Sequence, residues 1–462
     1  MNLNAHEPGP FPLDYRQAEI ERIARCLRAG DSCSIVGVSG MAKSNLFRHL
    51  LNTTVRYQYL VDNWWSYLFL AVDSHALSEV SERAMYNLLL ELLAKEAQGS
   101  ALPGEVIEHI RQLHQQSLAS SDVLLWQRAF TQAVEAVMAA DSTYKLVFLF
   151  DQFDELYQGL SPRFFIFLRS LRDQYKYRLC FLLFTRDELS QLGTFPEAEE
   201  FYEVLSPNVM ELSPYNHSDA MLLLARVSGR YEESLAAESS ERLIGLSGGH
   251  PGLLKATCMA LINEKLNLPQ DDPEASQTLL LVDDVRTECT KLWSSLDQEE
   301  QEALHGLATT GTAASYHPDL LRRLRLKQLI KNQSDRYQLL CPIFATFAAA
   351  QKTGSEPQIR VQAGPIRIDS AGEVWVGGKQ LTPSLTKKEL LLLEYFCLEP
   401  GRLRTKDEII AVVYPEEYQA GGTVTDDALA ALIKRLRDRL QQDATGKSYI
   451  ATLRGKGYRL EV

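Results

Sequence analysis

The chain has 462 residues, of which 45% are hydrophobic and 23% are charged, and its formal net charge is −12. This composition excludes a disordered chain, and the acidic balance excludes a protein that coats nucleic acid along its whole length. At about 100 to 200 residues per domain, the length predicts two to four domains.

Short apolar runs alternate with helical patterns in the first half of the chain. Helical spacing is present at 15–30, from Lys43 onward, and at about 77–96, 122–139 and 161–175. Strand-like runs lie at 32–38, 67–72, 145–150, 179–184 and 210–212. This alternation is typical of a parallel α/β sheet with helices on both faces.

The pattern changes twice in the second half of the chain. From about 215 to 350 it is helical throughout. From Ile359 onward, short alternating strands precede three helical stretches and a terminal hairpin. The polar segment 351–358 contains Gly and Pro and is the best candidate for a linker.

The cysteines and apolar runs indicate the compartment. The seven cysteines stand singly, without the paired spacing of a zinc site, as expected for reduced thiols in a cytosolic protein. The longest apolar runs are far shorter than the roughly 20 residues that cross a bilayer. The first residues show no basic flank before an apolar stretch. We therefore expect a cytoplasmic protein without a membrane partner.

The first predicted strand ends in the glycine turn GVSGMAKS, residues 37–44, which leads into a helix. In such a turn, backbone N–H groups surround a phosphate, and the helix N-terminus adds a positive dipole end. Lys43 would reach the β- and γ-phosphates, and the Ser44 hydroxyl would bind Mg²⁺.

Ala42 replaces the second glycine of the usual GxxxxGK[ST] pattern, and its methyl group is compatible with a helical backbone. The expected nucleotide contacts are Gly37, Gly40, Lys43, Ser44 and Asn45. The alternative is a glycine turn with a chance lysine.

Acidic residues follow another predicted strand, in LVFLFDQFDE at 146–155. Ligands bind at the carboxyl edge of a parallel sheet. Asp151 would therefore hold Mg²⁺ through water, and Asp154 or Glu155 would polarise the attacking water. The alternative is an acidic helix N-terminus that the helix dipole favours.

Two further segments complete the candidate site. Arg186 follows the fourth predicted strand, where an arginine can report on a γ-phosphate. The segment GGHPG, residues 248–252, stands at a helix start with Pro251 at the first helical position. Taken singly, Arg186 is explained equally well as an ordinary surface arginine. The segment 248–252 is explained equally well as an ordinary loop before a helix.

The segments GVSGMAKS, LVFLFDQFDEL, FTRDEL and GGHPGLL, in this order, resemble the STAND branch of AAA+-related NTPases over about residues 11–350. The resemblance implies a switch that is closed with ADP and oligomeric with ATP and Mg²⁺. It places Tyr15 and Arg16 near the adenine and makes Pro251 a nucleotide contact. Gln152 follows Asp151 where a glutamate is usual, and Ala42 replaces a glycine, so we expect slow ATP hydrolysis.

The same resemblance divides the chain. It implies a P-loop NTPase core at 11–213, a helical lid at 214–284 and a middle winged helix at 285–350. The linker at 351–358 and a C-terminal module at 359–462 follow. The expected fold class is thus an α/β P-loop NTPase followed by a helical and winged-helix region and a C-terminal α+β winged helix.

The C-terminal module differs in charge from the rest of the chain. Residues 356–462 contain 16 basic and 15 acidic residues, a net charge of +1. The basic residues Lys434, Arg435 and Arg437 lie on one predicted helix, opposite an apolar stripe. A basic face of this kind suits a helix in a DNA groove, although a solvated surface helix is the alternative.

The segments LTPSLTKKELLLLEYFCLEPGRLRTKDEIIAVVY, ALIKRLRDRL and IATLRGKGYRL closely resemble the OmpR-type winged-helix effector domain of bacterial response regulators. The resemblance implies contacts to double-stranded DNA by residues of the recognition helix and of the wing, namely Lys434, Arg435, Arg437, Thr452 and Arg454. Asp426 and Asp427 stand at the start of the recognition helix, where the family often has an arginine. Acids there repel phosphate, which leaves open a winged helix that binds protein.

These observations predict an ATP-dependent transcriptional regulator that self-associates in response to a protein or ligand signal. The alternative is a nucleotide-controlled scaffold in defence or stress signalling, whose C-terminal winged helix binds a protein. A third reading is a degenerate NTPase fold that keeps ADP as a structural element.

Overall fold

The computed structural model describes residues 11–461 except 75–76, 78, 193–195, 311–315, 334–335, 352–358, 370–373, 378, 382–384, 415–425, 441–447 and 454–455. The chain divides into two compact units, Met1–Gln351 and Lys352–Val462. Each unit is described by itself. The predicted linker falls almost entirely on 352–358 and lies outside the described residues.

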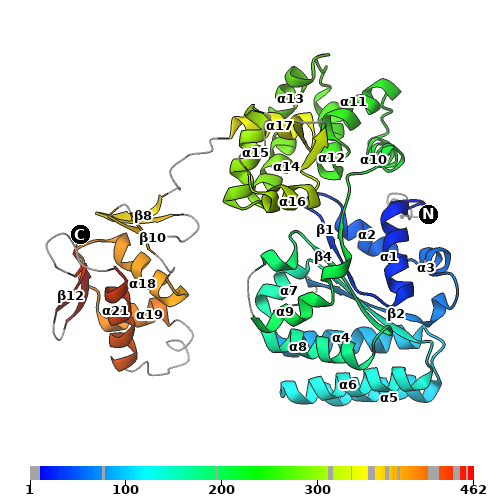
Figure 1. Ribbon diagram of the computed structural model, residues 1–462, viewed down its shortest axis with the longest axis horizontal. Helices are drawn as coiled ribbons and strands as arrows, with labels where there is room; N and C mark the ends of the chain where they lie inside the picture. Colours follow the sequence, from blue (N-terminus) through cyan, green and yellow to red (C-terminus); the bar gives the residue numbers. More distant parts are fainter. Residues whose placement is uncertain are drawn as a thin grey trace. The chain divides into compact units, whose positions relative to one another are not determined.

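A five-stranded sheet with the order β2-β3-β4-β1-β5 forms the centre of the first unit (Figure 1). All of its neighbouring strands run parallel, which confirms the predicted α/β fold. The strands are β1 (Cys33–Val36), β2 (Tyr67–Asp73), β3 (Lys145–Asp151), β4 (Leu179–Thr185) and β5 (Val209–Glu211).

Helices cover both faces of this sheet because successive side chains of a strand point to opposite faces. Phe148 and Phe150 of β3 pack in one apolar cluster, and Val147 and Leu149 pack in the other. One layer contains α1 (Gln17–Ala29), α2 (Lys43–Leu50) and α3 (Thr53–Leu60). The other contains α4 (Glu82–Gln98), α6 (Val123–Ala140), α7 (Phe153–Gly159), α8 (Pro162–Gln174) and α9 (Pro196–Glu203). The helix α5 (Gly104–Leu118) packs on α4 and α6.

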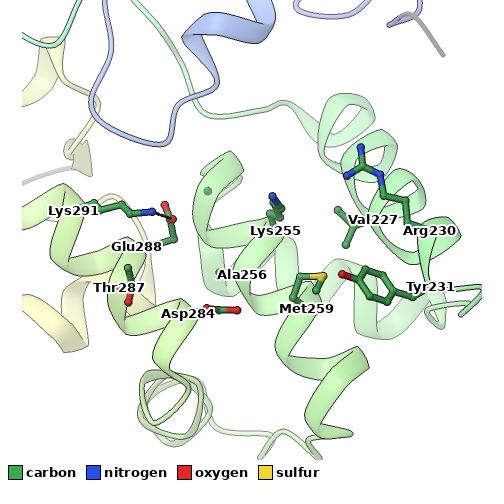
Figure 2. A pocket seen from close by; sticks show the side chains of 11 residues that line it. Val227, Arg230, Tyr231, Lys255, Ala256, Met259, Asp284, Thr287, Glu288 and Lys291 are labelled. Carbon is green, nitrogen blue, oxygen red and sulfur yellow. Dashed lines mark hydrogen bonds and ion pairs between the residues drawn. The ribbon is translucent and has the colours of Figure 1, made fainter. Parts of the chain in front are cut away.

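A helical region follows the sheet. Its elements are α10 (His217–Arg230), α11 (Ala237–Ser247), α12 (Pro251–Glu264), α13 (Asp272–Leu280), α14 (Asp283–Ser294), α15 (Gln298–Thr310), α16 (Pro318–Leu326), β6 (Ile330–Gln333), β7 (Arg336–Leu339) and α17 (Pro342–Ala350). The antiparallel hairpin β6–β7 corrects the prediction of helix throughout 215–350. Its strands have four residues each, too few for an alternating pattern to show in the sequence. Helices α10, α12 and α14 border a cavity (Figure 2).

The second unit is a winged helix, as predicted. A four-stranded antiparallel sheet contains β8 (Ile359–Ala363), β9 (Ile366–Asp369), β10 (Val374–Val376) and β11 (Lys379–Gln380). The other elements are α18 (Lys387–Leu398), α19 (Lys406–Val413), α21 (Asp426–Leu440) and the hairpin β12 (Ile450–Leu453) and β13 (Gly457–Leu460). The apolar stripe of α21, with Leu429, Leu432 and Leu436, is buried in the core of this unit.

No helix among the described residues combines the length and the apolar composition that crossing a bilayer requires.

The turn between β1 and α2 has an unusual backbone at Ala42. This residue has φ 59° and ψ 37°, so it does not have the helical backbone with which its methyl group would be compatible. In the left-handed region the Cβ atom crowds the following carbonyl oxygen, which costs about 1–2 kcal/mol for any residue except glycine. Gly40, two residues earlier, has φ 79° without this cost.

We predict that Ala42→Gly raises the free energy of unfolding by about 1 kcal/mol, because glycine relieves the strain at this position. Equilibrium unfolding in urea measures the change. The matched control is Ala225→Gly on the exposed face of α10, where glycine in a helix interior lowers stability by about 1 kcal/mol. Equal destabilisation by both changes would contradict the prediction.

Candidate functional site

The phosphate-binding loop, residues 37–44, lies at the carboxyl edge of the sheet, where β1 leads into α2. The Gly37 N–H donates to the carbonyl oxygen of Thr185 at 3.0 Å. The N–H groups of Val38, Ser39 and Gly40 donate to no acceptor within the described part of the chain. Free N–H groups at a helix N-terminus form a concave site for an anion.

Lys43 begins α2, and its ammonium group is folded back onto this loop. Nζ donates to the carbonyl oxygens of Gly37 and Val38, the latter at 3.1 Å. Burial lowers the pKa of Lys43 to about 8, against the attraction of Asp154 and Asp151. A phosphate in the loop would place a negative charge beside this half-buried cation.

The ends of β3 and β4 bring two further polar groups to the same edge. Asp151 is buried, and its Oδ1 accepts from the Gln152 N–H at 3.0 Å. The Thr185 hydroxyl is fully buried and has no hydrogen-bond partner among the described residues. The orphaned hydroxyl fits a site that a ligand completes, because buried polar groups are otherwise paired.

The oxygen ligands at this edge fit Mg²⁺ when it is shared with a nucleotide. Ser44 in the first turn of α2 and Asp151 offer a hydroxyl and a carboxylate. Among the described residues, no group of three or more His, Cys, Asp or Glu could hold a metal ion by itself. Mg²⁺ usually takes one or two protein oxygens together with phosphate oxygens and water, so a small protein donor set is sufficient.

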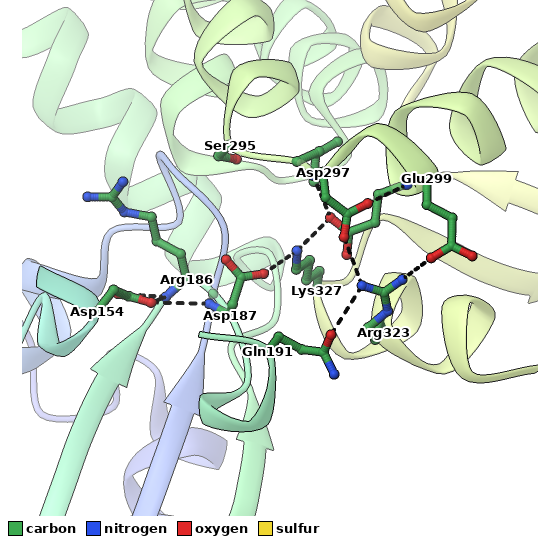
Figure 3. Close-up of polar contacts among 12 residues, drawn as sticks. Asp154, Arg186, Asp187, Gln191, Ser295, Asp297, Glu299, Arg323 and Lys327 are labelled. Carbon is green, nitrogen blue, oxygen red and sulfur yellow. Dashed lines mark hydrogen bonds and ion pairs between the residues drawn. The ribbon is translucent and has the colours of Figure 1, made fainter. Parts of the chain in front are cut away.

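The expected catalytic residues Asp154, Glu155 and Arg186 contact one another and are already paired. Figure 3 shows the contact of Asp154 with Arg186. Both carboxylate oxygens of Asp154 accept from the Arg186 N–H at 3.0 Å, and Oδ1 accepts from the Asp187 N–H at 3.4 Å. Burial raises the pKa of Asp154, and these backbone hydrogen bonds oppose the rise. Asp154 therefore fixes the chain after β4. Glu155 is exposed and pairs with the Arg186 guanidinium at 3.1 Å.

Tyr15 and Arg16, the predicted adenine contacts, are both buried. The Arg16 guanidinium donates to the carbonyl oxygens of Met41 at 2.9 Å and Ser213 at 2.8 Å. The Tyr15 hydroxyl lies 2.7 Å from the Tyr215 hydroxyl. The pair thus braces the phosphate-binding loop against the segment that follows β5.

The other two predicted nucleotide contacts also lie near the loop. Asn45 is half-buried in the first turn of α2, and its N–H donates to the Ala42 carbonyl oxygen at 3.1 Å. Pro251 is buried at the first position of α12.

His250 is a site residue that the sequence analysis did not assign. Its side chain is fully buried, with Nε2 lying 3.0 Å from the Ser39 carbonyl oxygen and Nδ1 accepting from the Leu253 N–H at 3.2 Å. These partners fix the proton on Nε2. Burial lowers the pKa of His250 to about 4, so the ring is neutral at pH 7. An added Cβ on Gly40 would lie 2.6 Å from the His250 ring, which explains the glycine there.

Lys327 is a second residue that the sequence analysis did not assign to the site. It connects the site to the segment 285–350 (Figure 3). Lys327 pairs with Asp187 and, at 2.7 Å, with Glu300, and only 6% of the Lys327 side chain is exposed. Asp187 follows Arg186, whose N–H binds Asp154. A chain of polar contacts therefore runs from the phosphate-binding edge to the hairpin region.

Two predicted DNA contacts, Lys434 and Arg435, lie on the exposed face of α21. Arg435 Nε is 3.7 Å from a carboxylate oxygen of Glu389 on α18. Lys434 forms no ion pair within the described residues. Of these two side chains, Lys434 is thus the one open to a phosphate.

Two other predicted DNA contacts bind each other. The Arg437 guanidinium donates to the Thr452 hydroxyl at 2.5 Å and to the Ile450 carbonyl oxygen at 2.9 Å. These bonds attach the recognition helix to β12, so Arg437 stabilises the unit. Arg454 lies outside the described residues.

We predict that His250→Asn weakens MgADP binding about tenfold, the equivalent of one lost hydrogen bond of about 1.4 kcal/mol. Asparagine keeps the acceptor for the Leu253 N–H but is too short to reach Ser39. His250→Gln is the matched control, because its amide reaches the Nε2 position, and we expect its affinity to stay near wild type. Titration with fluorescent ADP measures both. Wild-type affinity in the asparagine variant would refute this role.

The chain is similar to two known protein families. The model of a family described as "Novel STAND NTPase 1" matches residues 15–351, and that of "Transcriptional regulatory protein, C terminal" matches 380–460. The sensory transduction protein RegX3 of Mycolicibacterium smegmatis is 37% identical over 102 residues, 22% of this chain and 42% of that protein. The transcriptional regulatory protein TcrA of Mycobacterium tuberculosis is 30% identical over 120 residues, 26% of this chain and 45% of that protein. The chain thus spans less than half the length of these relatives.

Solved structures were also similar to parts of the chain. The Walker-type ATPase PABY2304 of Pyrococcus abyssi is 14% identical with a TM-score of 0.46, covering 74% of this chain and 98% of that one. The DNA-binding domain of Klebsiella pneumoniae RstA, solved with the RstA box, is 25% identical with a TM-score of 0.18, covering 22% of this chain and 96% of that one. The family match over most of the sequence decides the assignment: this chain belongs to the Novel STAND NTPase 1 family and carries a C-terminal transcriptional-regulator module.

Proposed function

We propose that the protein is an ATP-dependent switch that regulates transcription, with its nucleotide state controlling self-association and binding of double-stranded DNA. The observation that carries this proposal is the phosphate-binding loop with its free N–H groups and the half-buried cation Lys43. A triphosphate is the ligand whose charge and shape match these groups.

In this proposal Ser44 and Asp151 would hold the Mg²⁺ that accompanies the nucleotide. The bound ion would neutralise phosphate charge during hydrolysis. Asp154 is occupied by two backbone N–H groups, Glu155 by Arg186, and a glutamine follows Asp151. Because these carboxylates are already paired, we expect slow hydrolysis. Slow hydrolysis suits a switch that remains in one state for a long time.

The contacts beyond Arg186 support coupling between the nucleotide and the segment 285–350. A γ-phosphate near the end of β4 would attract Arg186 and so disturb the adjacent pair between Asp187 and Lys327. The Asp187 side chain is 25% exposed, so this pair contributes less than the about 3–5 kcal/mol of a fully buried pair. Breaking it would supply only part of the about 5.5 kcal/mol that moves a two-state equilibrium from 1:99 to 99:1.

The C-terminal module supports the DNA-binding part of the proposal. Lys434 and Arg435 are exposed on α21, the helix that would enter the major groove. A single module with few phosphate contacts binds weakly. Pairing two modules by self-association would raise the overall affinity without any new contact.

A second candidate function is a nucleotide-controlled scaffold whose winged helix binds a protein. It is favoured by Arg437 and Thr452, which bind each other, and by the acids at positions 426 and 427. These features leave fewer cations for DNA on α21.

We predict that Lys43→Ala abolishes ATP-dependent self-association, since alanine removes the cation that faces the β- and γ-phosphates. Light scattering of the full chain with MgADP and with a non-hydrolysable ATP analogue measures the mass of the assembly. Lys176→Ala, an exposed lysine after α8, is the control and should behave like wild type. Oligomers that persist unchanged in the Lys43 variant would disprove the switch.

Duplex DNA binding should weaken steeply between low and moderate salt, because bound counterions are released. We expect Lys434→Ala to lower the slope of log affinity against log salt by about 1. The control is Arg367→Gln, on β9 in the four-stranded sheet of the second unit. This change should leave the slope unchanged. Fluorescence anisotropy measures the slopes. Absence of binding at low salt, with and without ATP, would favour the scaffold.

A further inference from the structure

A cavity of about 380 Å³ lies among α10, α12 and α14 (Figure 2). This volume is within the range of small-molecule sites, about 300–1,000 Å³. None of the loop residues 37–44 is among the residues that line it, so the cavity is separate from the proposed nucleotide site.

Two cations without partners point into the upper part of this cavity. Arg230 extends from the end of α10, and Lys255 extends from α12 (Figure 2). Neither side chain forms an ion pair or hydrogen bond within the described residues. Glu288 on α14 does not neutralise them, because it pairs with Lys291 at 2.6 Å. Two cations in a concave site select an anionic group.

The remaining walls limit the size and charge of the ligand. Val227 and Ala256 are buried and, together with Met259, form an apolar wall. Tyr231 and Met259 also line the cavity. Asp284 on α14 would repel a second anionic group. The cavity therefore fits a molecule with one anionic end and an apolar body.

The cavity also borders the phosphate-binding loop. Gly252 lines the cavity, and its N–H donates to the Gly40 carbonyl oxygen at 3.0 Å. An added Cβ on Gly252 would lie 2.6 Å from Glu288 Oε2 and 3.3 Å from Gly40 Cα. A ligand that moves α12 against α14 would therefore shift the contact between Gly252 and Gly40.

We propose that this cavity is a binding site for a small organic anion, with one carboxylate or phosphate group on an apolar body. Occupancy would change the release of nucleotide through the contact between Gly252 and Gly40. This second effect rests on the proposed nucleotide function, whereas binding of the anion does not.

The test is calorimetric titration of the full chain with benzoate and with phenyl phosphate, in saturating MgADP to block the phosphate-binding loop. We expect one of the probes to bind at a single site, and the preferred probe distinguishes a carboxylate from a phosphate ligand. Arg230→Gln and Lys255→Gln should each weaken its binding at least about tenfold, the loss of one charge-assisted hydrogen bond. Lys176→Gln should not change it.

Three results would overturn the site: no binding of either probe, equal binding of neutral benzyl alcohol, or binding that neither cavity variant weakens. The rate of fluorescent ADP release, with and without the probe, tests the coupling separately. A protein that binds a probe but no ADP would retain the anion site and lose the nucleotide function.

Discussion

The buried ion pairs of Lys327 are the constraint on which the arrangement of the first unit depends. Glu300 is fully buried, burial raises its pKa, and Lys327 is the cation that opposes this rise. Without Lys327 the carboxylate would be an uncompensated buried charge, at a cost of about 3–5 kcal/mol. Because Lys327 also pairs with Asp187, the same cation holds the segment 285–350 against the loop that follows β4.

The phosphate-binding loop is likewise held from several distant parts of the chain. Arg16 from before α1 binds the Met41 carbonyl oxygen, and His250 from before α12 lies within hydrogen-bonding distance of the Ser39 carbonyl oxygen. The left-handed backbone at Ala42 persists within these contacts. Strained backbone of this kind survives where the surroundings determine it, and it is common at ligand sites. The loop is thus in contact with the N-terminal segment, the helical region and the sheet at once.

Much of the fold and part of the candidate site could be predicted from the sequence, since both depend on local patterns. Alternating apolar runs predict the buried strands, and a glycine turn before a helix predicts the loop around Lys43. The hairpin β6–β7 was missed because its strands are short. The contacts of His250 with Ser39 and of Lys327 with Asp187 join residues more than 100 positions apart, and no spacing rule reaches that far. The bond between Arg437 and Thr452 likewise depends on how the hairpin packs on α21.

The central claim is that a triphosphate binds the loop at 37–44 and that its charge disturbs the ion pair between Asp187 and Lys327. Hydrogen–deuterium exchange of the full chain, with and without a non-hydrolysable MgATP analogue, tests both parts at once. The account predicts slower exchange of the Val38–Ser44 amides, since the phosphates would accept from them, and altered exchange in α16 and β6 on either side of Lys327. Unchanged exchange in the loop would contradict nucleotide binding, and a change confined to the loop would contradict the coupling.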